Sequence, residues 1–292
     1  MRYRPICAIA LAPWEVEDVI DAAVSGGQVT AGHGAYRISV APLRGERVSL
    51  SLDEPGCRVN AKVSIGDLAG LRGERRILLA AGDKLGIAEI RGHRYYKLVP
   101  TIPGSAPTLE IDGIHMHRVR GSDPLRDTRY KVAEARIRVG VEVLDTCMGL
   151  GYTAIASVLR GARRVITVEI DRNVIELSRV NPWSWRLSDN RISVVHSDVT
   201  EYVRSLESES FDRVIHDPPR ITSRSGPLYS LDFYKELYRI MKPRGVLFHY
   251  TGEPGRKHGA NFPGRIASKL KRAGFRVVRY SRRALGLVAV KD

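Results

Sequence analysis

Glutamine, cysteine and long apolar runs are scarce in this chain. Gln28 is the only glutamine among 292 residues, and the three cysteines, Cys7, Cys57 and Cys147, lie far apart. Such spacing suits neither a disulfide framework nor a zinc site, so we expect free thiols in a reducing cytoplasm. No apolar run approaches the length of a membrane span, and the first residues do not resemble a secretory leader. We therefore expect a cytoplasmic protein without a membrane partner.

Charge is abundant where amides are scarce, a combination that is typical of heat-adapted proteins. The net charge of +15 is unevenly distributed: residues 1–100 contribute +3 and residues 251–292 contribute +9. Clustered Arg and Lys favour a polyanionic partner such as RNA, with phosphate contacts supplying affinity. A solvated, heat-adapted surface explains the same charge equally well. Charge alone leaves both interpretations open.

The apolar pattern from about residue 141 predicts strands alternating with helices. Buried parallel strands read as short apolar runs, and helices repeat apolar residues every three or four positions. The predicted strands lie at residues 141–145, 164–170, 191–196, 211–216, 245–250, 276–280 and 284–291. The predicted helices lie at residues 153–159, 172–180, 199–206, 231–241 and 265–273. This order predicts an α/β fold with a doubly wound, mostly parallel sheet of seven strands.

The chain before residue 141 has a different pattern. A helical repeat that begins at a proline, at residues 13–23, precedes several short strand-like runs. Two prolines at residues 101–107, directly after Pro100, predict a linker, and a hairpin and an entry helix (residues 128–137) follow. We therefore expect a small α+β domain at residues 1–100 that contacts RNA or substrate. Residues 101–140 would connect it to a catalytic domain at residues 141–292.

A glycine-containing turn follows the first predicted strand of the catalytic domain. It reads Asp145-Thr146-Cys147-Met148-Gly149-Leu150-Gly151 and leads into a helix, whose amino terminus offers unpaired N–H groups. A glycine turn alone is weak evidence, because many α/β folds use one for packing. Acidic residues at the next strand ends strengthen it. Glu169 can chelate ribose hydroxyls, and Asp198 can accept from an adenine amino group.

The motif excludes two common nucleotide sites. Only Gly149 and Gly151 are present, so the three-glycine dinucleotide fingerprint is missing. No lysine follows them, which excludes a phosphate-gripping P-loop. A nucleoside ligand without a pyrophosphate fits the pattern better, and no residue spacing predicts a metal site.

Asp217-Pro218-Pro219-Arg220 ends the fourth predicted strand. Two prolines cannot continue the ladder, so a carboxylate and a rigid turn stand at the sheet edge where α/β proteins bind ligands. The Asp217 carboxylate and the Pro218 carbonyl could bind both protons of an amine and orient its lone pair for methyl transfer. A helix cap is the structural alternative for Asp217.

Residues 141–250 resemble a class I S-adenosylmethionine-dependent methyltransferase. The resemblance implies S-adenosyl-L-methionine as cofactor, S-adenosyl-L-homocysteine as product and no metal. It also implies cofactor contacts from the first motif and the next two strand ends: Asp145, Thr146, Cys147, Gly149, Gly151, Glu169, Ile170, Asp198 and Val199. The first motif departs from the usual pattern, because Thr146, Cys147 and Met148 stand where its first glycine would lie.

The fourth-strand motif resembles the Asp/Asn/Ser-Pro-Pro-aromatic motif of methyltransferases that act on planar nitrogens, except for Arg220. Together with the first motif it resembles an archaeal methyltransferase family. This implies transfer to a base amine of RNA, with cytidine N4 of small-subunit ribosomal RNA as the leading target. Asp217, Pro218, Pro219 and Arg220 would form the catalytic set. The residues expected to touch substrate are Arg220, Tyr229, Tyr250, Arg256 and Lys257.

Two other functions stay open at this point. An aminopropyltransferase acting on a polyamine uses a related fold and a decarboxylated cofactor, although basic rim loops would repel a cationic substrate. A catalytically silent RNA-binding or ribosome-assembly factor could also retain the fold. On the entry helix, Thr128, Tyr130 and Lys131 could cover the cofactor, with ordinary amphipathic packing as the alternative. The oligomeric state is left open.

Overall fold

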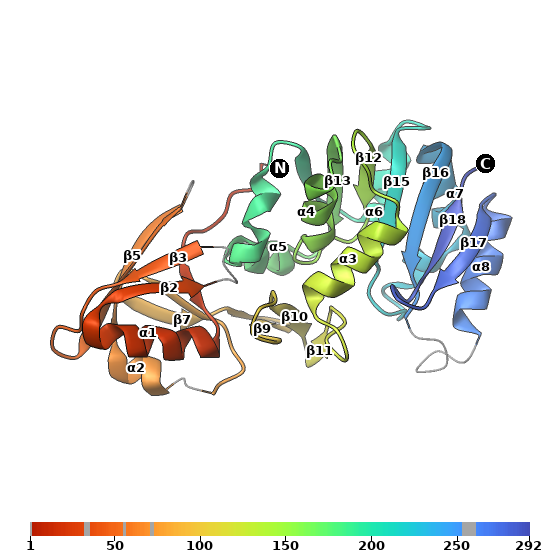
Figure 1. Cartoon of the computed structure of the whole chain (residues 1–292). Coiled ribbons are helices and arrows are strands. Elements are labelled where there is room, and N and C mark those ends of the chain that lie inside the picture. Colours follow the sequence, from red (N-terminus) through yellow and green to blue (C-terminus); the bar gives the residue numbers. More distant parts are fainter. Residues whose placement is uncertain (1, 32–35, 55–56, 71–72, 253–260) are drawn as a thin grey trace. The chain divides into compact units, whose positions relative to one another are not determined.

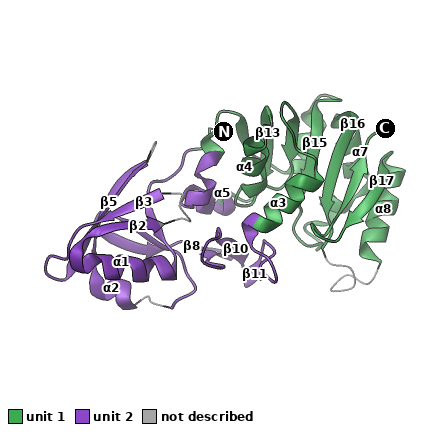
Figure 2. Ribbon diagram, viewed as in Figure 1, with its two compact units in different colours: residues 1–3, 126–172, 187–292 green, residues 4–125, 173–186 purple. Residues whose placement is uncertain are grey.

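A seven-stranded sheet forms the centre of the carboxyl-terminal part of the chain in the computed structural model (Figure 1). The structure describes residues 2–31, 36–54, 57–70, 73–252 and 261–292. The chain divides into two compact units (Figure 2). The large-sheet unit comprises residues 1–3, 126–172 and 187–292, and the small-sheet unit comprises residues 4–125 and 173–186.

The large sheet has the strand order β14-β13-β12-β15-β16-β18-β17. Its strands are β12 (Glu142–Asp145), β13 (Arg164–Glu169), β14 (Ile192–His196), β15 (Phe211–His216), β16 (Met241–Tyr250), β17 (Arg276–Ser281) and β18 (Gly286–Val290). The five strands β12 to β16 are parallel, and β18 runs antiparallel to β16 and β17. The order reverses beside β12, where such sheets bind ligands. The predicted doubly wound, mostly parallel fold is confirmed.

Helices connect these strands. They are α3 (Pro124–Glu134), α4 (Tyr152–Leu159), α5 (Arg172–Arg179), α6 (Val199–Tyr202), α7 (Leu231–Ile240) and α8 (Phe262–Arg272), with the 3-10 turns η2 (Pro182–Ser188), η3 (Val203–Ser205) and η4 (Gly226–Tyr229). The start of α7 follows from its sequence, because the Ser230 hydroxyl accepts the Phe233 N–H at 3.1 Å as an N-cap.

The large sheet is buried on both faces. Apolar side chains of α7 and α8, including Phe233, Leu237 and Ile266, share one cluster with Leu144 and Leu247 of the sheet. Side chains alternate along a strand, so the neighbouring residues point to the other face. These neighbours, Val143, Ile215 and Phe248, are also fully buried. Burial on both sides explains the continuous apolar runs of β12, β15 and β16.

The entry helix α3 begins earlier than the sequence predicts. Its first residue is Pro124 rather than residue 128. The Asp123 carboxylate accepts the Leu125 N–H at 3.0 Å, and proline is favoured in the first helical turn because its missing N–H has no intrahelical partner. The extra turn brings Asp127 into the helix.

The small-sheet unit contains three small antiparallel sheets. Their orders are β1-β6-β7, β2-β3-β4-β5 and β11-β10-β9-β8. The strands are β1 (Ile9–Leu11), β2 (Gly27–Ala31), β3 (Tyr36–Val40), β4 (Arg47–Glu54), β5 (Cys57–Ser64), β6 (Leu78–Ala81), β7 (Lys84–Ile87), β8 (Glu89–Arg91), β9 (Tyr95–Val99), β10 (Thr108–Ile111) and β11 (Ile114–His115). The helices α1 (Pro13–Ser25) and α2 (Ile65–Gly70) belong to the same unit, and Val16, Val19 and Leu68 pack into its core.

Residues 101–107, which the sequence predicts to be a linker, connect β9 to β10 within one sheet. The two strands pair antiparallel, with Val99 opposite Thr108. The division of the chain at residues 100 and 140 stays a prediction about its domains.

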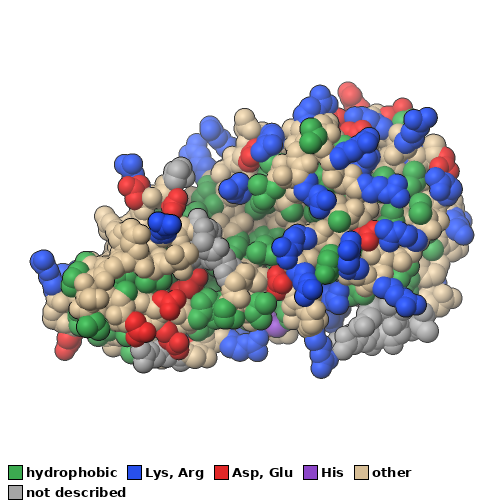
Figure 3. Space-filling view, viewed as in Figure 1, with side chains coloured by type: hydrophobic (Ala, Val, Ile, Leu, Met, Phe, Trp, Pro, Cys, Tyr) green, Lys and Arg blue, Asp and Glu red, His purple; other side chains and the backbone are tan. Residues whose placement is uncertain are grey.

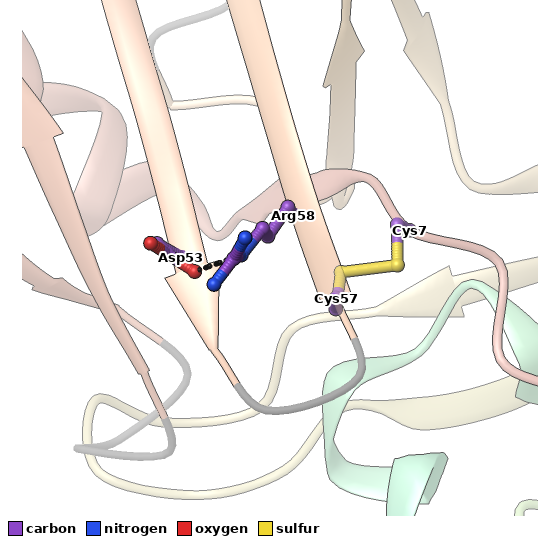
Figure 4. Close-up of a disulfide and its surroundings, with 4 residues drawn as sticks. All are labelled: Cys7, Asp53, Cys57 and Arg58. Atoms are coloured by element: carbon purple, nitrogen blue, oxygen red, sulfur yellow. Dashed lines mark hydrogen bonds and ion pairs between the residues drawn. A yellow bond between two sulfur atoms is a disulfide. The ribbon is translucent and has the colours of Figure 1, made fainter.

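Cys7 and Cys57 form a disulfide, so the expectation of free thiols at these positions is wrong. Their Cα atoms are 5.4 Å apart although 50 residues separate them in sequence (Figure 4). The exposed ion pair between Arg58 and Asp53 joins the adjacent strands β5 and β4 beside it. Spacing along the chain does not reveal a pair that the folding of β1 and β5 brings together. Cys147 is a free thiol.

Basic side chains cover much of the large-sheet unit on the face seen in Figure 3. On α8 and the strand after it, Arg265, Lys271, Arg272 and Arg276 are exposed, as the charge distribution predicts. In the described part of the chain, every helix is too short or too polar to cross a membrane.

Reduction of the Cys7–Cys57 disulfide should destabilise the small-sheet unit. A cross-link across 50 residues lowers the entropy of the unfolded chain, which corresponds to about 4 kcal/mol of stability at 25 °C. We expect a lower Tm in the presence of dithiothreitol, measured by calorimetry. Cys57→Ser should reproduce the shift without reductant. Cys147→Ser is the matched control, and an equal response of wild type and Cys57→Ser to dithiothreitol would contradict this role.

Candidate active site

The loop after β12 is held by backbone hydrogen bonds to both neighbouring strands. The Thr146 N–H donates to the Ile215 carbonyl at 3.0 Å, and the Met148 N–H donates to the Val168 carbonyl at 2.8 Å. Gly149 and Gly151 have φ of 54° and 77°, the left-handed region that favours glycine. A Cβ at Gly151 would lie 2.6 Å from Leu187, whereas one at Gly149 would meet no atom within 4 Å among the described residues. The loop therefore presents open space beside Gly149.

Asp145 ends β12 and is fully buried. Its Oδ2 accepts the hydroxyls of Thr153 and Thr167 at 2.9 and 2.8 Å, while Oδ1 has no hydrogen-bond partner among the described residues. Burial raises the pKa of Asp145 to about 7 despite these hydroxyls. A buried oxygen without a partner leaves this carboxyl group able to bind a donor or a proton.

Glu169 ends β13 and is half-buried. Its Oε2 accepts the Gly149 N–H and its Oε1 accepts the Asp171 N–H, each at 2.9 Å. Burial raises the pKa of Glu169 to about 7, although both N–H groups act in the opposite direction. Each oxygen keeps a lone pair, because a carboxylate accepts about four hydrogen bonds. The geometry fits a diol ligand such as ribose.

The other predicted cofactor residues differ in exposure. The Asp198 carboxylate caps α6 by accepting the N–H and the hydroxyl of Thr200, both at 2.7 Å. Val199 is buried, and Ile170 is 63% exposed. Burial raises the pKa of the half-buried Cys147 thiol, and the nearby Glu169 carboxylate adds to the effect. Ligand contacts by these residues stay predictions.

Asp217 follows β15, with its carboxylate bound to a lysine of α3. The Lys131 ammonium donates to Asp217 Oδ2 at 2.6 Å and pairs with Asp127 Oδ2 at 2.7 Å. It also lies 4.6 Å from the centre of the Tyr250 ring. The Asp217 side chain is 21% exposed, whereas those of Lys131 and Asp127 are 3% and 1% exposed. Of these three side chains, only that of Asp217 is thus accessible to a ligand.

The turn after Asp217 is anchored by Tyr229. Pro218 is buried, while Pro219 and Arg220 are exposed. The Tyr229 hydroxyl donates to the Pro219 carbonyl at 2.7 Å, and its buried ring packs near His249 and Phe262. The structure therefore gives Tyr229 a contact with the turn. Substrate contacts by Arg220, Tyr229 and Tyr250 stay predictions, and Arg256 and Lys257 lie outside the described residues.

Two buried histidines lie beneath this turn. His216 Nδ1 contacts the Thr146 hydroxyl at 2.7 Å and Nε2 contacts the Leu228 carbonyl at 3.0 Å, so Nε2 carries the proton. Burial lowers the pKa of His216 to about 3, so it stays neutral. His249 Nε2 contacts the Tyr234 hydroxyl at 2.8 Å, and burial also lowers its pKa. The neutral His216 ring thus ties the loop after β12 to η4, and the His249 ring contacts α7.

No motif of the sequence predicts Asp127 as part of the site. Asp127, Lys131 and Glu134 follow helical spacing and are all buried, which is unusual for charged residues on one face of a helix. Charged residues at positions where a packed helix normally has apolar residues are therefore the sequence signal for this part of the site. The partner of Lys131 lies 86 residues further along the chain, and the spacing does not identify it.

We define the strand-end cluster as Asp127, Lys131, Asp145, Glu169 and Asp217. Four of its members are carboxyl groups and one is an ammonium. The Asp145 carboxyl interacts electrostatically with both Asp217 and Lys131, which places these groups close together. The excess of carboxylates makes this edge of the sheet attractive to cations, in contrast to the basic exterior.

Residues 149–279 resemble a known protein family. These residues match the family model of the spermine/spermidine synthase domain. A polyamine aminopropyltransferase of Clostridioides difficile is 31% identical over 110 residues, which cover 37% of this chain and 39% of that protein. The match thus spans about two-fifths of that relative's length. The matched model describes an enzyme domain.

A crystal structure of spermidine synthase in complex with the transition state analogue AdoDATO has the same fold. It superimposes with a TM-score of 0.56 at 22% identity, covering 70% of this chain and 73% of that one. At this identity the similarity establishes the α/β fold.

These matches contradict the expectation of an RNA base-amine methyltransferase and of RNA as partner. The family model and the named aminopropyltransferase both concern polyamines. This expectation is wrong for a physical reason, because the charge of the basic exterior and of the rim loops does not determine the charge of the site. Inside, the strand-end cluster contains more carboxylates than ammonium groups. Asp217 occupies the predicted sheet edge, but its buried partner is Lys131, which also binds Asp127.

One relative matches over most of its length. The uncharacterized protein MJ1233 of Methanocaldococcus jannaschii is 48% identical over 205 residues, which cover 70% of this chain and 69% of that protein. Identity at this level over two thirds of both chains establishes common descent. The chain therefore belongs to the family of MJ1233.

Proposed function

We propose that this protein transfers an aminopropyl group from decarboxylated S-adenosylmethionine to an amine nitrogen of a polyamine. The match to the spermine/spermidine synthase domain and the similarity to a polyamine aminopropyltransferase support this reaction class. The strand-end cluster is the observation that carries the proposal. Its four carboxyl groups and one ammonium favour a cationic donor and a cationic acceptor over anionic ligands.

The residues around β12 and β13 fit the donor. Glu169 would accept the two ribose hydroxyls with the lone pairs that Gly149 and Asp171 leave free. The open space at Gly149 would let the loop of residues 145–151 lie against the sulfonium end of the donor. Asp198 and Val199 would contact the adenine ring. When bound, the donor supplies a sulfonium carbon that an amine can attack, with a neutral thioether as leaving group.

Asp217 would act on the acceptor. Its exposed oxygen would accept a hydrogen bond from the amine and hold the nitrogen lone pair toward the sulfonium-bound carbon. As the nitrogen–carbon bond forms, the electrons of the carbon–sulfur bond stay on sulfur, and Asp217 takes the proton that the nitrogen releases. Pro218 and Pro219, with the Tyr229 hydroxyl on the Pro219 carbonyl, would keep the carboxylate at a fixed position.

Asp217→Asn should abolish most of the transfer while leaving donor binding intact. The amide cannot take the proton, so we expect kcat to fall at least about a hundred-fold. Purified protein would be incubated with decarboxylated S-adenosylmethionine and a panel of diamines and triamines. Mass spectrometry would detect the aminopropylated product, and calorimetry would measure donor affinity.

Asp212→Asn is the matched control, because Asp212 lies in the same strand at its opposite end. It should retain wild-type transfer. Absence of any aminopropylated product from the wild-type protein with every acceptor would refute the proposed function.

Donor affinity should depend on pH through Glu169. Burial raises the pKa of this carboxyl group to about 7 in the free protein, and the ionised form accepts hydroxyls best. Affinity should therefore fall about ten-fold between pH 8 and pH 6, as the protonated fraction rises. Calorimetric titrations at both pH values would measure it.

Glu169→Gln should bind the donor more weakly and with a flatter pH dependence, because only Asp145 would remain to titrate in this range. Glu201→Gln, at an exposed position of α6, is the control. Wild-type affinity that is equal at pH 6 and pH 8 would count against Glu169 as the ribose ligand.

A further inference from the structure

We propose that Lys131 is a positioning residue for the acceptor: it holds Asp217 from the buried side, so that one carboxylate oxygen is fixed and the other faces the acceptor nitrogen. The inference rests on the proposed function, because it assigns Asp217 to the acceptor amine. Lys131 itself would touch neither donor nor acceptor, since its side chain is only 3% exposed.

The Lys131 ammonium is held by two carboxylates and one aromatic ring. One binds Asp127 Oδ2 at 2.7 Å and one binds Asp217 Oδ2 at 2.6 Å. The remaining side of the ammonium lies 4.6 Å from the Tyr250 ring centre, a distance typical of a cation–π contact. A lysine that is buried and held by two carboxylates and a ring cannot rotate freely, so its ammonium is a fixed point.

The helix that carries Lys131 is itself fixed at its other end. Glu134, one turn further along α3, accepts the Ser281 hydroxyl at 2.8 Å and pairs with Arg279 of β17. Asp127, one turn before Lys131, completes the i, i+4 pair on the same face. Charged contacts at successive turns thus determine the rotation of α3 and the position of the Lys131 ammonium.

This arrangement divides the two oxygens of Asp217 between two tasks. Oδ2 is bound to Lys131, and the exposed part of the group remains for a ligand. Asp127, Lys131 and Asp217 together carry one net negative charge when ionised, which suits a single additional cationic or proton-releasing nitrogen. A carboxylate without such an anchor would sample several rotamers, and small displacements of a reacting group reduce rates strongly.

Lys131 also opposes the effect of burial on Asp217. Burial raises the pKa of Asp217, and the Lys131 ammonium acts in the opposite direction. Burial likewise lowers the pKa of Lys131, but the carboxylates of Asp217 and Asp127 outweigh it and raise that pKa above its ordinary value. The groups that interact with Lys131 are Asp127 on α3, Asp145 at the end of β12, Asp217 after β15 and Tyr250 on β16. Burial raises the pKa of Tyr250, and the nearby Arg220 guanidinium acts in the opposite direction.

The test compares Lys131→Met, Lys131→Arg and Asp127→Asn with wild type in the transfer assay. Lys131→Met removes the charge at similar length, so kcat/KM for the acceptor should fall about a hundred-fold. The acid limb of its pH profile for kcat/KM should move to higher pH, because the Lys131 ammonium no longer opposes the effect of burial on the pKa of Asp217. Donor affinity, measured by calorimetry, should stay within about two-fold of wild type. Lys131→Arg, which keeps the positive charge, should have a kcat/KM for the acceptor between those of Lys131→Met and wild type.

Lys242→Met is the matched control. Lys242 also binds two carboxylates, Glu142 and Asp212 at 3.1 and 3.2 Å, but it lies at the opposite end of the parallel strands. The Lys242→Met substitution should leave both the acceptor kinetics and the pH profile unchanged. Asp127→Asn keeps the Lys131–Asp217 contact, and it should lower kcat/KM for the acceptor less than Lys131→Met does. It should move the acid limb of the pH profile to lower pH, because the Asp127 carboxylate raises the pKa of Asp217. These two changes preserve the test if Lys131→Met does not fold.

Three results would overturn the inference. Wild-type acceptor kinetics in Lys131→Met would do so, as would an equal loss of donor and acceptor binding, which indicates general structural damage. A misfolded Lys131→Met together with an unaltered pH profile in Asp127→Asn would also do so. If wild type transfers no aminopropyl group at all, the proposed function fails first, and the role of Lys131 fails with it. The wild-type reaction therefore separates the two failures.

Discussion

The parallel register of the large sheet is the constraint on which the site depends. Asp145 pairs with Thr167 and Ile215, Glu169 pairs with His196, and His216 pairs with His249. Parallel pairing brings the carboxyl ends of β12, β13, β15 and β16 to one edge, where each strand contributes a polar residue. A shift of one residue in any strand would move its carboxylate to the opposite face of the sheet.

Burial of several carboxyl groups at one edge has an electrostatic cost, and the structure offsets it locally. Backbone N–H groups donate hydrogen bonds to Glu169, and threonine hydroxyls donate to Asp145. The Lys131 ammonium pairs with both Asp127 and Asp217. Burial nevertheless keeps the pKa values of Asp145 and Glu169 near 7. The site is thus built to gain from a cationic ligand, whereas the arginine-rich surface of the same unit is positive.

The sequence predicted the features that depend on local pattern. Apolar runs located the strands of the large sheet, and polar residues after them located Asp145, Glu169 and Asp217 at its edge. It did not predict features that depend on distant pairing. Cys7 meets Cys57 across 50 residues, and Lys131 meets Asp217 across 86. The partner class was predicted wrongly because net charge describes the surface, while the ligand experiences the buried groups. The ligand roles of Asp198, Ile170 and Cys147 stay predictions.

The most direct measurement of the central claim is donor discrimination by the free protein. Calorimetry would compare decarboxylated S-adenosylmethionine with S-adenosylmethionine, which differ in one carboxylate. An edge with an excess of carboxylates repels that group, so the decarboxylated donor should bind about ten-fold more tightly or better. Equal or tighter binding of S-adenosylmethionine would contradict the account.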